Sequence, residues 1–179
     1  RRGHILIMFD WVNVKRGGKR MRTILVYSSK YGCTEKCAEI LAKKLSGETR
    51  LINLKKDKNP DLSGYDSVVV GGPIYIGKIN KEVKSFCAKN LDLLKGRRLG
   101  LFICCMAEGE QAKGELDGAF RKELLETAIA KDYFGGEFMV TKMNPMDRLI
   151  VKKIAKTENN VSNILTDRIE RFARLMNQG

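Results

Sequence analysis

The sequence predicts an α/β protein built on a doubly wound, five-stranded parallel sheet of order 2-1-3-4-5. Short apolar runs of strand type alternate with stretches in which apolar residues recur at helical spacing. The 179 residues are enough for one domain with a substantial core. The two unusual loops, Ser28–Thr34 and Gly71–Lys78, follow the first and third expected strands. In this strand order, that is where the ligand crevice lies.

Five apolar segments have the length and composition of strands buried in a parallel sheet. In chain order they are Thr23–Tyr27, Thr49–Leu54, Ser67–Val70, Leu99–Cys105 and Asp132–Phe138. The third is expected to end abruptly at Gly71-Gly72-Pro73, because Gly and Pro favour a turn. Lys55–Gly64 is expected to be a loop or a single helical turn.

Helices are expected between and after these strands, on both faces of the sheet. The first begins at Thr34, ends before Gly47 and has an apolar stripe of Cys37, Ala38, Leu41 and Leu45. Asn80 is suited to cap the second, whose apolar face is Val83, Phe86, Cys87 and Leu91. The remaining three are Glu110–Ala130, Met146–Lys156 and Asn160–Asn177.

Residues 1–20 differ from the rest, with six basic side chains against one aspartate. Their apolar stretch from Ile5 to Val14 is broken by Asp10 and Asn13, unlike the apolar core of a signal peptide. We interpret residues 1–20 as a leader or an added segment, and residues 21–179 as the folded domain. An interfacial or partner-binding extension is the alternative for residues 1–20.

The chain is strongly basic, with 34 Lys and Arg, 21 Asp and Glu, and a formal net charge of +13. This balance indicates either anionic partners or a lysine-rich solvated surface. Nucleic-acid binding is not expected, because the basic residues do not alternate with aromatic ones. No apolar run approaches the roughly 20 residues of a membrane span. We expect a cytoplasmic protein, because the five cysteines have the pattern of reduced thiols.

Five cysteines without a C-x-x-C pair indicate reduced thiols rather than a disulfide framework. Cys33 and Cys37 lie four residues apart, but no further ligands are evident, so no metal site is predicted. Cys104 and Cys105 are expected on opposite faces of a strand. The single histidine is His4, so residues 21–179 lack the histidine that most hydrolase mechanisms use.

The Ser28–Thr34 loop has the features of an anion site at the start of a helix. Ser29 and Thr34 carry hydroxyl donors, Gly32 allows close approach, and the first N–H groups of a helix lack intrahelical partners. A capped helix start with an incidental glycine is the alternative. A P-loop and a dinucleotide fingerprint are excluded because their glycine patterns are absent. A response-regulator receiver is excluded because the first and third strands lack the acidic residues it needs.

The segment from Leu25 to Leu41 resembles the signature of the flavodoxin family, in which apolar residues and an aromatic precede x-[ST]-x-x-G-x-T. The loop Gly71–Lys78 resembles that family's G-x-P-[IV]-Y-x-G segment. The resemblance covers about residues 22–179 and implies a non-covalent FMN and electron transfer through it. It places the phosphate on Ser29, Lys30, Tyr31, Gly32, Cys33 and Thr34.

The same resemblance places the flavin ring between the second loop and the loop after the fourth strand. The residues implied there are Pro73, Ile74, Tyr75, Ile76, Gly77, Met106 and Ala107. Tyr75 is expected to stack on the ring, or else to pack between loops. Gly71, Gly72 and Gly77 are candidates for a peptide flip coupled to protonation of the ring. No catalytic residue is assigned.

Two features differ from a soluble flavodoxin: the chain is basic, and Met106–Gly109 lacks an aromatic residue over the flavin. The tail resembles the flavodoxin-like protoporphyrinogen dehydrogenases that reduce menaquinone, in Met146-Asp147-Arg148 and in Thr166-Asp167. The connector Thr157–Asn163 lacks the Gly-Gly-containing stretch of that group. The resemblance implies either a redox partner protein or a quinone or porphyrinogen substrate.

The helix Met146–Lys156 is expected to be amphipathic, with Met146, Leu149, Ile150 and Ile154 on one side. Most of its basic residues lie on the other side. It is either an ordinary surface helix or a segment that contacts an acidic substrate or an anionic membrane surface. In the second case, the protein would be peripheral at the inner membrane face.

Overall fold

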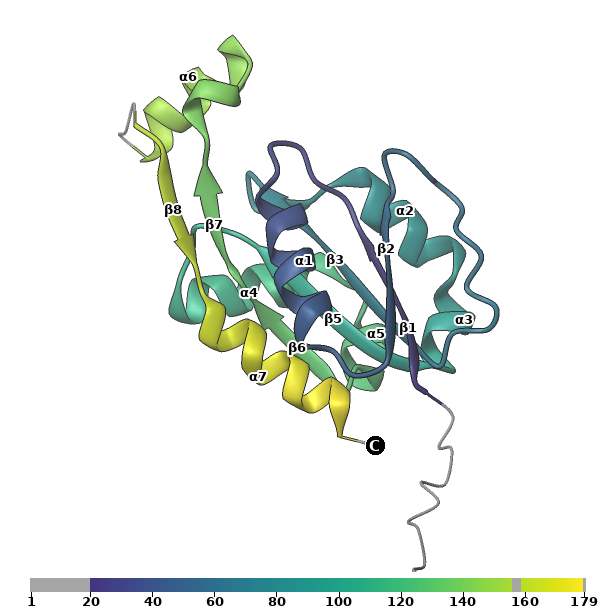
Figure 1. The fold of residues 1–179 in the computed structure, drawn as a ribbon. Coiled ribbons are helices and arrows are strands. Elements are labelled where there is room, and N and C mark those ends of the chain that lie inside the picture. The colour runs from purple at the N-terminus through teal and green to yellow at the C-terminus, as the bar shows by residue number, and fades with distance from the viewer. Residues whose placement is uncertain (1–19, 156–158, 179) are drawn as a thin grey trace, which may run out of the picture.

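The computed structural model describes residues 20–155 and 159–178, so the predicted leader, except for Arg20, lies outside the described residues. Five parallel strands form the central sheet in the order β2-β1-β3-β5-β6 (Figure 1). Their bounds are β1 (Arg22–Tyr27), β2 (Glu48–Asn53), β3 (Ser67–Tyr75), β5 (Arg98–Cys104) and β6 (Ala130–Tyr133). This is the doubly wound order that the sequence predicted.

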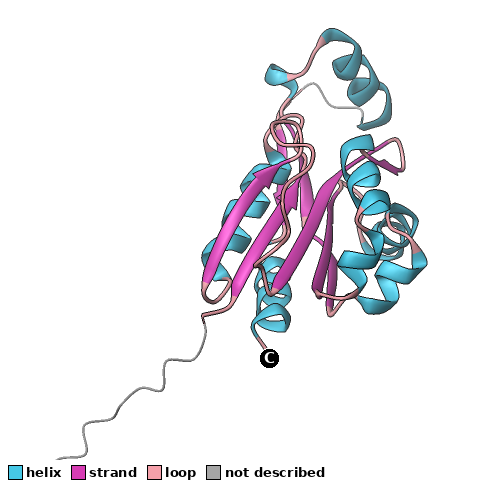
Figure 2. Ribbon diagram, turned by 90° about the vertical axis from the view of Figure 1, so that its right-hand side faces the viewer, coloured by secondary structure: helices cyan, strands magenta, loops and turns pink. Residues whose placement is uncertain are grey.

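Helices cover both faces of this sheet (Figure 2). One layer is α1 (Cys33–Lys44) and α7 (Thr166–Asn177). The other layer is α2 (Lys81–Lys89), α3 (Leu91–Lys95), α4 (Gly109–Ala119) and α5 (Lys122–Thr127). The α1 and α7 side is filled by three phenylalanines, with the Phe102 and Phe134 rings stacked at 4.6 Å and Phe172 edge-on to both.

Strand β5 contributes side chains to the cores on both faces of the sheet, because alternate side chains of a strand point to opposite faces. Leu101 and Ile103 belong to the core under α2–α5, and Phe102 and Cys104 to the core under α1 and α7. The next residue, Cys105, again lies on the α2–α5 side. Cys104 and Cys105 therefore lie on opposite faces, as predicted.

Strand β3 is longer than predicted, because it runs through Gly71-Gly72-Pro73 instead of ending there. It stays paired with β5 as far as Pro73, opposite Cys104. Gly71 allows a close approach within the sheet, since a Cβ there would lie 2.1 Å from the Phe102 ring. A two-residue turn of Ile76 (φ 49°) and Gly77 (φ 69°) then leads into the antiparallel β4 (Lys78–Ile79). Two positive φ angles are characteristic of a type I′ hairpin.

Two predicted helices are interrupted. Leu91 does not continue the helix after Asn80 but begins α3. The predicted helix Glu110–Ala130 divides into α4 and α5 around the extended, buried Phe120, and Ala130 starts β6. An unbroken helix of that span would be ~30 Å long, whereas a seven-residue strand such as β5 spans ~23 Å. The break lets both halves pack on the sheet.

The predicted strand Asp132–Phe138 is also two strands. After β6, the chain turns at Gly135 (φ 75°), and β7 (Gly135–Phe138) pairs antiparallel with β8 (Val161–Ile164). Residues 161–164 had been predicted as part of the last helix. Gly135 is required, since a Cβ there would lie 1.8 Å from the Asn163 carbonyl oxygen.

The β7–β8 ribbon leads to a 3-10 helix, η1 (Val140–Lys142), and to α6 (Pro145–Ala155), which extend from the main body (Figure 1). Helix α6 corresponds to the predicted Met146–Lys156, of which residue 156 lies outside the described residues. None of the helices within residues 20–155 and 159–178 has the length and apolar character needed to cross a membrane.

Candidate functional site

A cavity of about 480 Å³ opens at the carboxyl ends of β1, β3 and β5. Twelve of the thirteen predicted site residues line it: Ser29, Lys30, Tyr31, Cys33, Thr34, Pro73, Ile74, Tyr75, Ile76, Gly77, Met106 and Ala107. The thirteenth, Gly32, shapes the loop between them. The fold thus brings together three loops that are far apart in the sequence, and their binding role stays a prediction.

The loop before α1 depends on the left-handed backbone conformation of Gly32. This glycine has a φ of 98°, and its N–H donates to Ser29 Oγ at 3.1 Å. A Cβ on Gly32 would find none of the chain's described atoms within 4 Å. The N–H groups of residues 33–35 follow, and being first in their helix they have no intrahelical acceptors. The loop therefore combines open space at Gly32 with the unpaired first N–H groups of α1, next to the cavity.

Asn80 supports this loop from α2. It occupies the N-cap position, as predicted, but makes no capping bond with its side chain. Instead its Nδ2 donates to Ser28 Oγ and, at 3.0 Å, to a Glu82 carboxylate oxygen. Ser28 is fully buried, so this contact fixes the end of β1 relative to α2.

Helix α6 is attached to the same loop through Asp147. The Asp147 carboxylate accepts hydrogen bonds from Lys30 Nζ and Tyr31 Oη, and Asn144 Nδ2 lies 3.3 Å from it. The hydrogen bond from Lys30 lowers the pKa of Asp147 below its ordinary value, and the same bond raises the pKa of Lys30. Lys30 Nζ also lies 5.3 Å from the ring centroids of both Tyr31 and Tyr75.

The apolar side chains of helix α6 are divided between the body, the cavity and solvent. Val151 is buried against Val140 and Met143, Ile150 lines the cavity, and Met146 and Leu149 are 73% and 67% exposed. Part of the predicted apolar side therefore faces solvent. The predicted position of Ile154 cannot be compared, since its side chain lies outside the described residues.

A family model for the flavodoxin domain matches residues 24–163. The chain belongs to this family. Its fold resembles an oxidoreductase from Corynebacterium diphtheriae (16% identity, TM-score 0.55, covering 87% of this chain and 94% of that one). It also resembles oxidised Flavodoxin 2 from Bacillus cereus (15% identity, TM-score 0.54, covering 87% of this chain and 97% of that one). No curated protein matches the sequence.

The fold also matches part of a larger protein. Rubredoxin oxygen:oxidoreductase from Desulfovibrio gigas matches with 16% identity, a TM-score of 0.53 and coverage of 87% of this chain. The chain spans 36% of that protein's length. At these identities the likeness concerns the fold alone.

Several lining residues of this flavodoxin domain could not be found from the sequence. They come from α4, from β5 and the residue after it, from β7, and from α6 and the segment before it: Gln111, Glu115, Cys104, Cys105, Gly136, Glu137, Phe138, Met143, Asp147, Ile150 and Val151. Lys30 and Asp147 are 117 residues apart, and no local pattern predicts such a contact. By contrast, Gly71 and Gly72, named as candidates for a peptide flip, are paired within β3 and do not line the cavity, whereas Gly77 does.

Proposed function

We propose that this flavodoxin domain binds FMN non-covalently in the cavity and transfers electrons through it. The observation that supports this most directly is the open, donor-rich loop at Gly32, directly beside a cavity of about 480 Å³. That volume lies within the usual range of small-molecule sites. Bound flavin supplies one- and two-electron chemistry, and the protein supplies orientation and electrostatics.

The loop residues are suited to hold the phosphate. The first N–H groups of α1, the hydroxyls of Ser29 and Thr34, and the helix dipole all favour an anion at this point. Lys30 adds a cation, although its ammonium is hydrogen-bonded to Asp147. Phosphate binding at the loop would therefore be sensitive to the position of α6.

The remaining cavity walls are suited to the flavin ring. Tyr75, Met106 and Ala107 offer apolar contacts, and burial raises the pKa of Tyr75 far above its ordinary value, so its phenol stays neutral. Glu115 Oε2 is buried and makes no hydrogen bond within normal geometry among the described residues, although the Glu115 carboxylate lies near the Cys105 thiol. A buried oxygen without a partner is costly, so it is suited to accept a hydrogen bond from a ligand.

The proposal is tested by titrating the protein with FMN and, separately, with riboflavin, which lacks the phosphate. We expect a yellow FMN complex and markedly weaker riboflavin binding. Ser29→Ala and Thr34→Ala should each weaken FMN binding by about 1 kcal/mol, roughly fivefold, with little effect on riboflavin. Ser63→Ala, in an exposed loop outside the cavity, is the matched control. A protein that stays colourless with excess FMN would contradict the proposal.

A second candidate function is that of an FMN-dependent dehydrogenase passing electrons to a quinone, with a porphyrinogen as donor. Ile76 on the hairpin tip and Met146 and Leu149 on α6 favour it, since these side chains are 74%, 73% and 67% exposed. They extend from two segments that line the cavity. Exposed apolar groups on a chain of charge +13 are suited to an anionic membrane surface.

The two functions differ in what reduces and reoxidises the flavin. Under anaerobic conditions, a dehydrogenase would be reduced by protoporphyrinogen and reoxidised by a menaquinone analogue. An electron carrier would instead exchange electrons with a redox partner protein and show no turnover with these compounds. The absence of turnover would rule out the second candidate while leaving the FMN proposal intact.

A further inference from the structure

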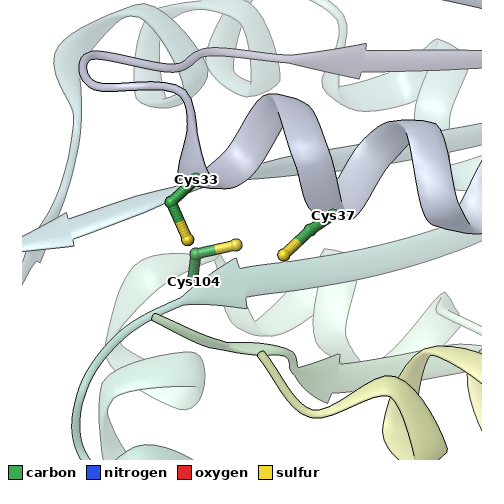
Figure 3. Close-up of side chains that lie close together, drawn as sticks. All are labelled: Cys33, Cys37 and Cys104. Atoms are coloured by element: carbon green, nitrogen blue, oxygen red, sulfur yellow. The ribbon is translucent and has the colours of Figure 1, made fainter. Parts of the chain in front are cut away.

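Three thiols converge beside the cavity: the Cys33 and Cys37 pair noted in the sequence, and Cys104, which is far from both in the chain. Cys33 is the first residue of α1, Cys37 lies one turn later, and Cys104 ends β5. Their Sγ atoms all lie within 4.8 Å of one another. Figure 3 shows the three side chains turned toward each other between the helix and the strand.

Two rigid elements produce this arrangement. Residues four apart on a helix share a face, so Cys33 and Cys37 both face the sheet. Strand alternation turns Cys104 toward the same layer, as it does Phe102. Cys37 and Cys104 are buried, at 0% and 4% exposure, and Cys33 is partly exposed. The positions are therefore fixed by packing rather than by a mobile loop.

The spacing fits a single metal ion. With metal–sulfur bonds of ~2.3 Å, sulfurs around one ion are ~3.8 Å apart in a tetrahedral site and ~4.0 Å apart in a trigonal one. A movement of less than about 1 Å would bring the three sulfurs to those separations. The N-terminus of α1 also favours the thiolate form at Cys33, because the helix dipole is positive there.

We propose that Cys33, Cys37 and Cys104 bind one soft metal ion, Cu(I), through three thiolates. Thiolates select soft ions such as Cu(I) and Zn(II). Structural Zn(II) takes four protein ligands. In the described part of the chain, the group contains these three cysteines and no histidine or carboxylate as a fourth member. Three sulfur ligands suit Cu(I) better, and binding releases the thiol protons to solvent.

A metal ion can reach the three thiols through the cavity. Cys33 and Cys104 line the cavity, and Cys37 lies behind them. The three thiols are argued from their own geometry and not from the FMN proposal, but Cys33 and Cys104 line the cavity that FMN would occupy. Cu(I) binding is therefore measured on FMN-free protein and FMN binding on copper-free protein, so that either can fail alone.

A disulfide between two of the thiols is the competing interpretation. A disulfide joins only two sulfurs, so any one pair would leave the third thiol free although it lies within 4.8 Å of both. A pair involving Cys104 would leave the third thiol without a role. The convergence of three sulfurs, rather than two, favours the metal.

The test uses the full chain, reduced and kept anaerobic, with Cu(I) supplied against a chromogenic Cu(I) chelator. We expect one Cu(I) per chain by native mass spectrometry and weaker retention of Zn(II). Cys33→Ser, Cys37→Ser and Cys104→Ser should each weaken Cu(I) binding at least tenfold. Cys87→Ser is the matched control, since Cys87 is buried in the opposite core and should leave the affinity unchanged.

X-ray absorption on the unsubstituted protein tests the site without relying on variants that fold poorly. Three sulfur neighbours and no nitrogen or oxygen would support the assignment. Loss of all copper to the chelator, a shell containing nitrogen or oxygen, or unchanged affinity in Cys104→Ser would overturn it. So would a disulfide between any two of the three thiols that persists under reducing conditions.

Discussion

At the scale of single residues, Ile76 has the least favourable backbone conformation in the cavity wall. Its φ of 49° is left-handed, a region that β-branched residues avoid at a cost of roughly 1–2 kcal/mol. Its side chain is also 74% exposed. Burial therefore does not compensate for the strain, and we infer that the apolar side chain at the hairpin tip is retained for binding.

Replacing Ile76 with Asn should therefore stabilise the protein while weakening binding. Asn is favoured at the first position of a type I′ turn, so the free energy of unfolding should rise by about 1 kcal/mol. Denaturant unfolding measures this change, and a flavin titration measures the expected loss of affinity. The control is Leu93→Asn on α3, where the residue is 47% exposed in helical backbone and should be neutral or slightly destabilising. If the two variants behave alike, Ile76 is not strained.

The buried carboxylate of Asp132 provides a second prediction at this scale. It is 5% exposed and accepts hydrogen bonds from Arg168 at 2.7 Å and Arg171 at 2.5 Å, which tie α7 to β6. Asp132→Ala should lower the free energy of unfolding by about 2 kcal/mol, since bonds to charged groups are lost and two arginines lose their acceptor. Chemical denaturation should show this, whereas Asp117→Ala on the exposed face of α4 should change stability by less than about 0.5 kcal/mol. Equal effects would mean that the Asp132 bonds contribute nothing.

The residues that could be predicted are those whose role is local. The Ser29–Thr34 loop was recognisable because hydroxyls, a glycine and a following helix are adjacent in the chain. Gly71 was misread as a turn, because its actual constraint is the Phe102 ring on a neighbouring strand. Cys104 was likewise not connected with Cys33, since only the register of β5 against the first helix brings them together.

At the scale of elements, α6 is the part of the site that depends most on one contact. It adds Asp147, Ile150 and Val151 to the cavity and contacts the loop before α1 through Asp147. Asp147→Asn should loosen it, because Lys30 would lose its anionic partner. Amide hydrogen exchange across Pro145–Ala155 should accelerate roughly fivefold, with little change in the strands of the main sheet. The control is Asp117→Asn on α4, and unchanged exchange in α6 would show that Asp147 does not attach it.

The same contact predicts how α6 responds to pH. Folding lowers the pKa of Asp147. The stability that its ionised carboxylate gives to the attachment of α6 is therefore fully present above the pKa of about 3.9 in the unfolded chain, and it is lost as the pH falls through the lower pKa of the folded protein. Because folding raises the pKa of Lys30, the cation persists up to and beyond its ordinary value of about 10.4. Protection of the α6 amides, measured as the intrinsic exchange rate divided by the observed rate, should therefore stay high between roughly pH 4 and 10 and should fall in acid. A flat acid profile, equal to that of Asp147→Asn, would contradict this.

Helices and strands could be predicted where the local spacing of apolar residues determines them. They could not be predicted where contacts with distant parts of the chain determine them. The first four strands and α1 were located because apolar runs and stripes are properties of the local sequence. Strand β8 was misassigned to a helix, because four residues carry little periodicity and its pairing with β7 is what stabilises it. The position of α6 was not predictable for the same reason.

At the scale of the whole molecule, the cavity lies where loops from both helical layers meet at one edge of a shared sheet. A ligand bound there contacts the loops after β1, β3 and β5 at once, so it should stabilise the domain as a unit. At an FMN concentration 100 times its Kd, the expected gain is about 2.7 kcal/mol. For a domain of this size that corresponds to a rise in Tm of roughly 5–10 °C.

Calorimetry with and without FMN measures this shift, with the Ser29→Ala, Thr34→Ala double variant as the control that should shift less at the same concentration. We also predict a single transition in both states, because β5 contributes side chains to both cores and neither layer can unfold alone. A Tm that does not respond to FMN would argue against the flavin site. Two separate transitions would instead show that α6 and the β7–β8 ribbon unfold independently of the sheet, and that the ligand stabilises only one of these parts.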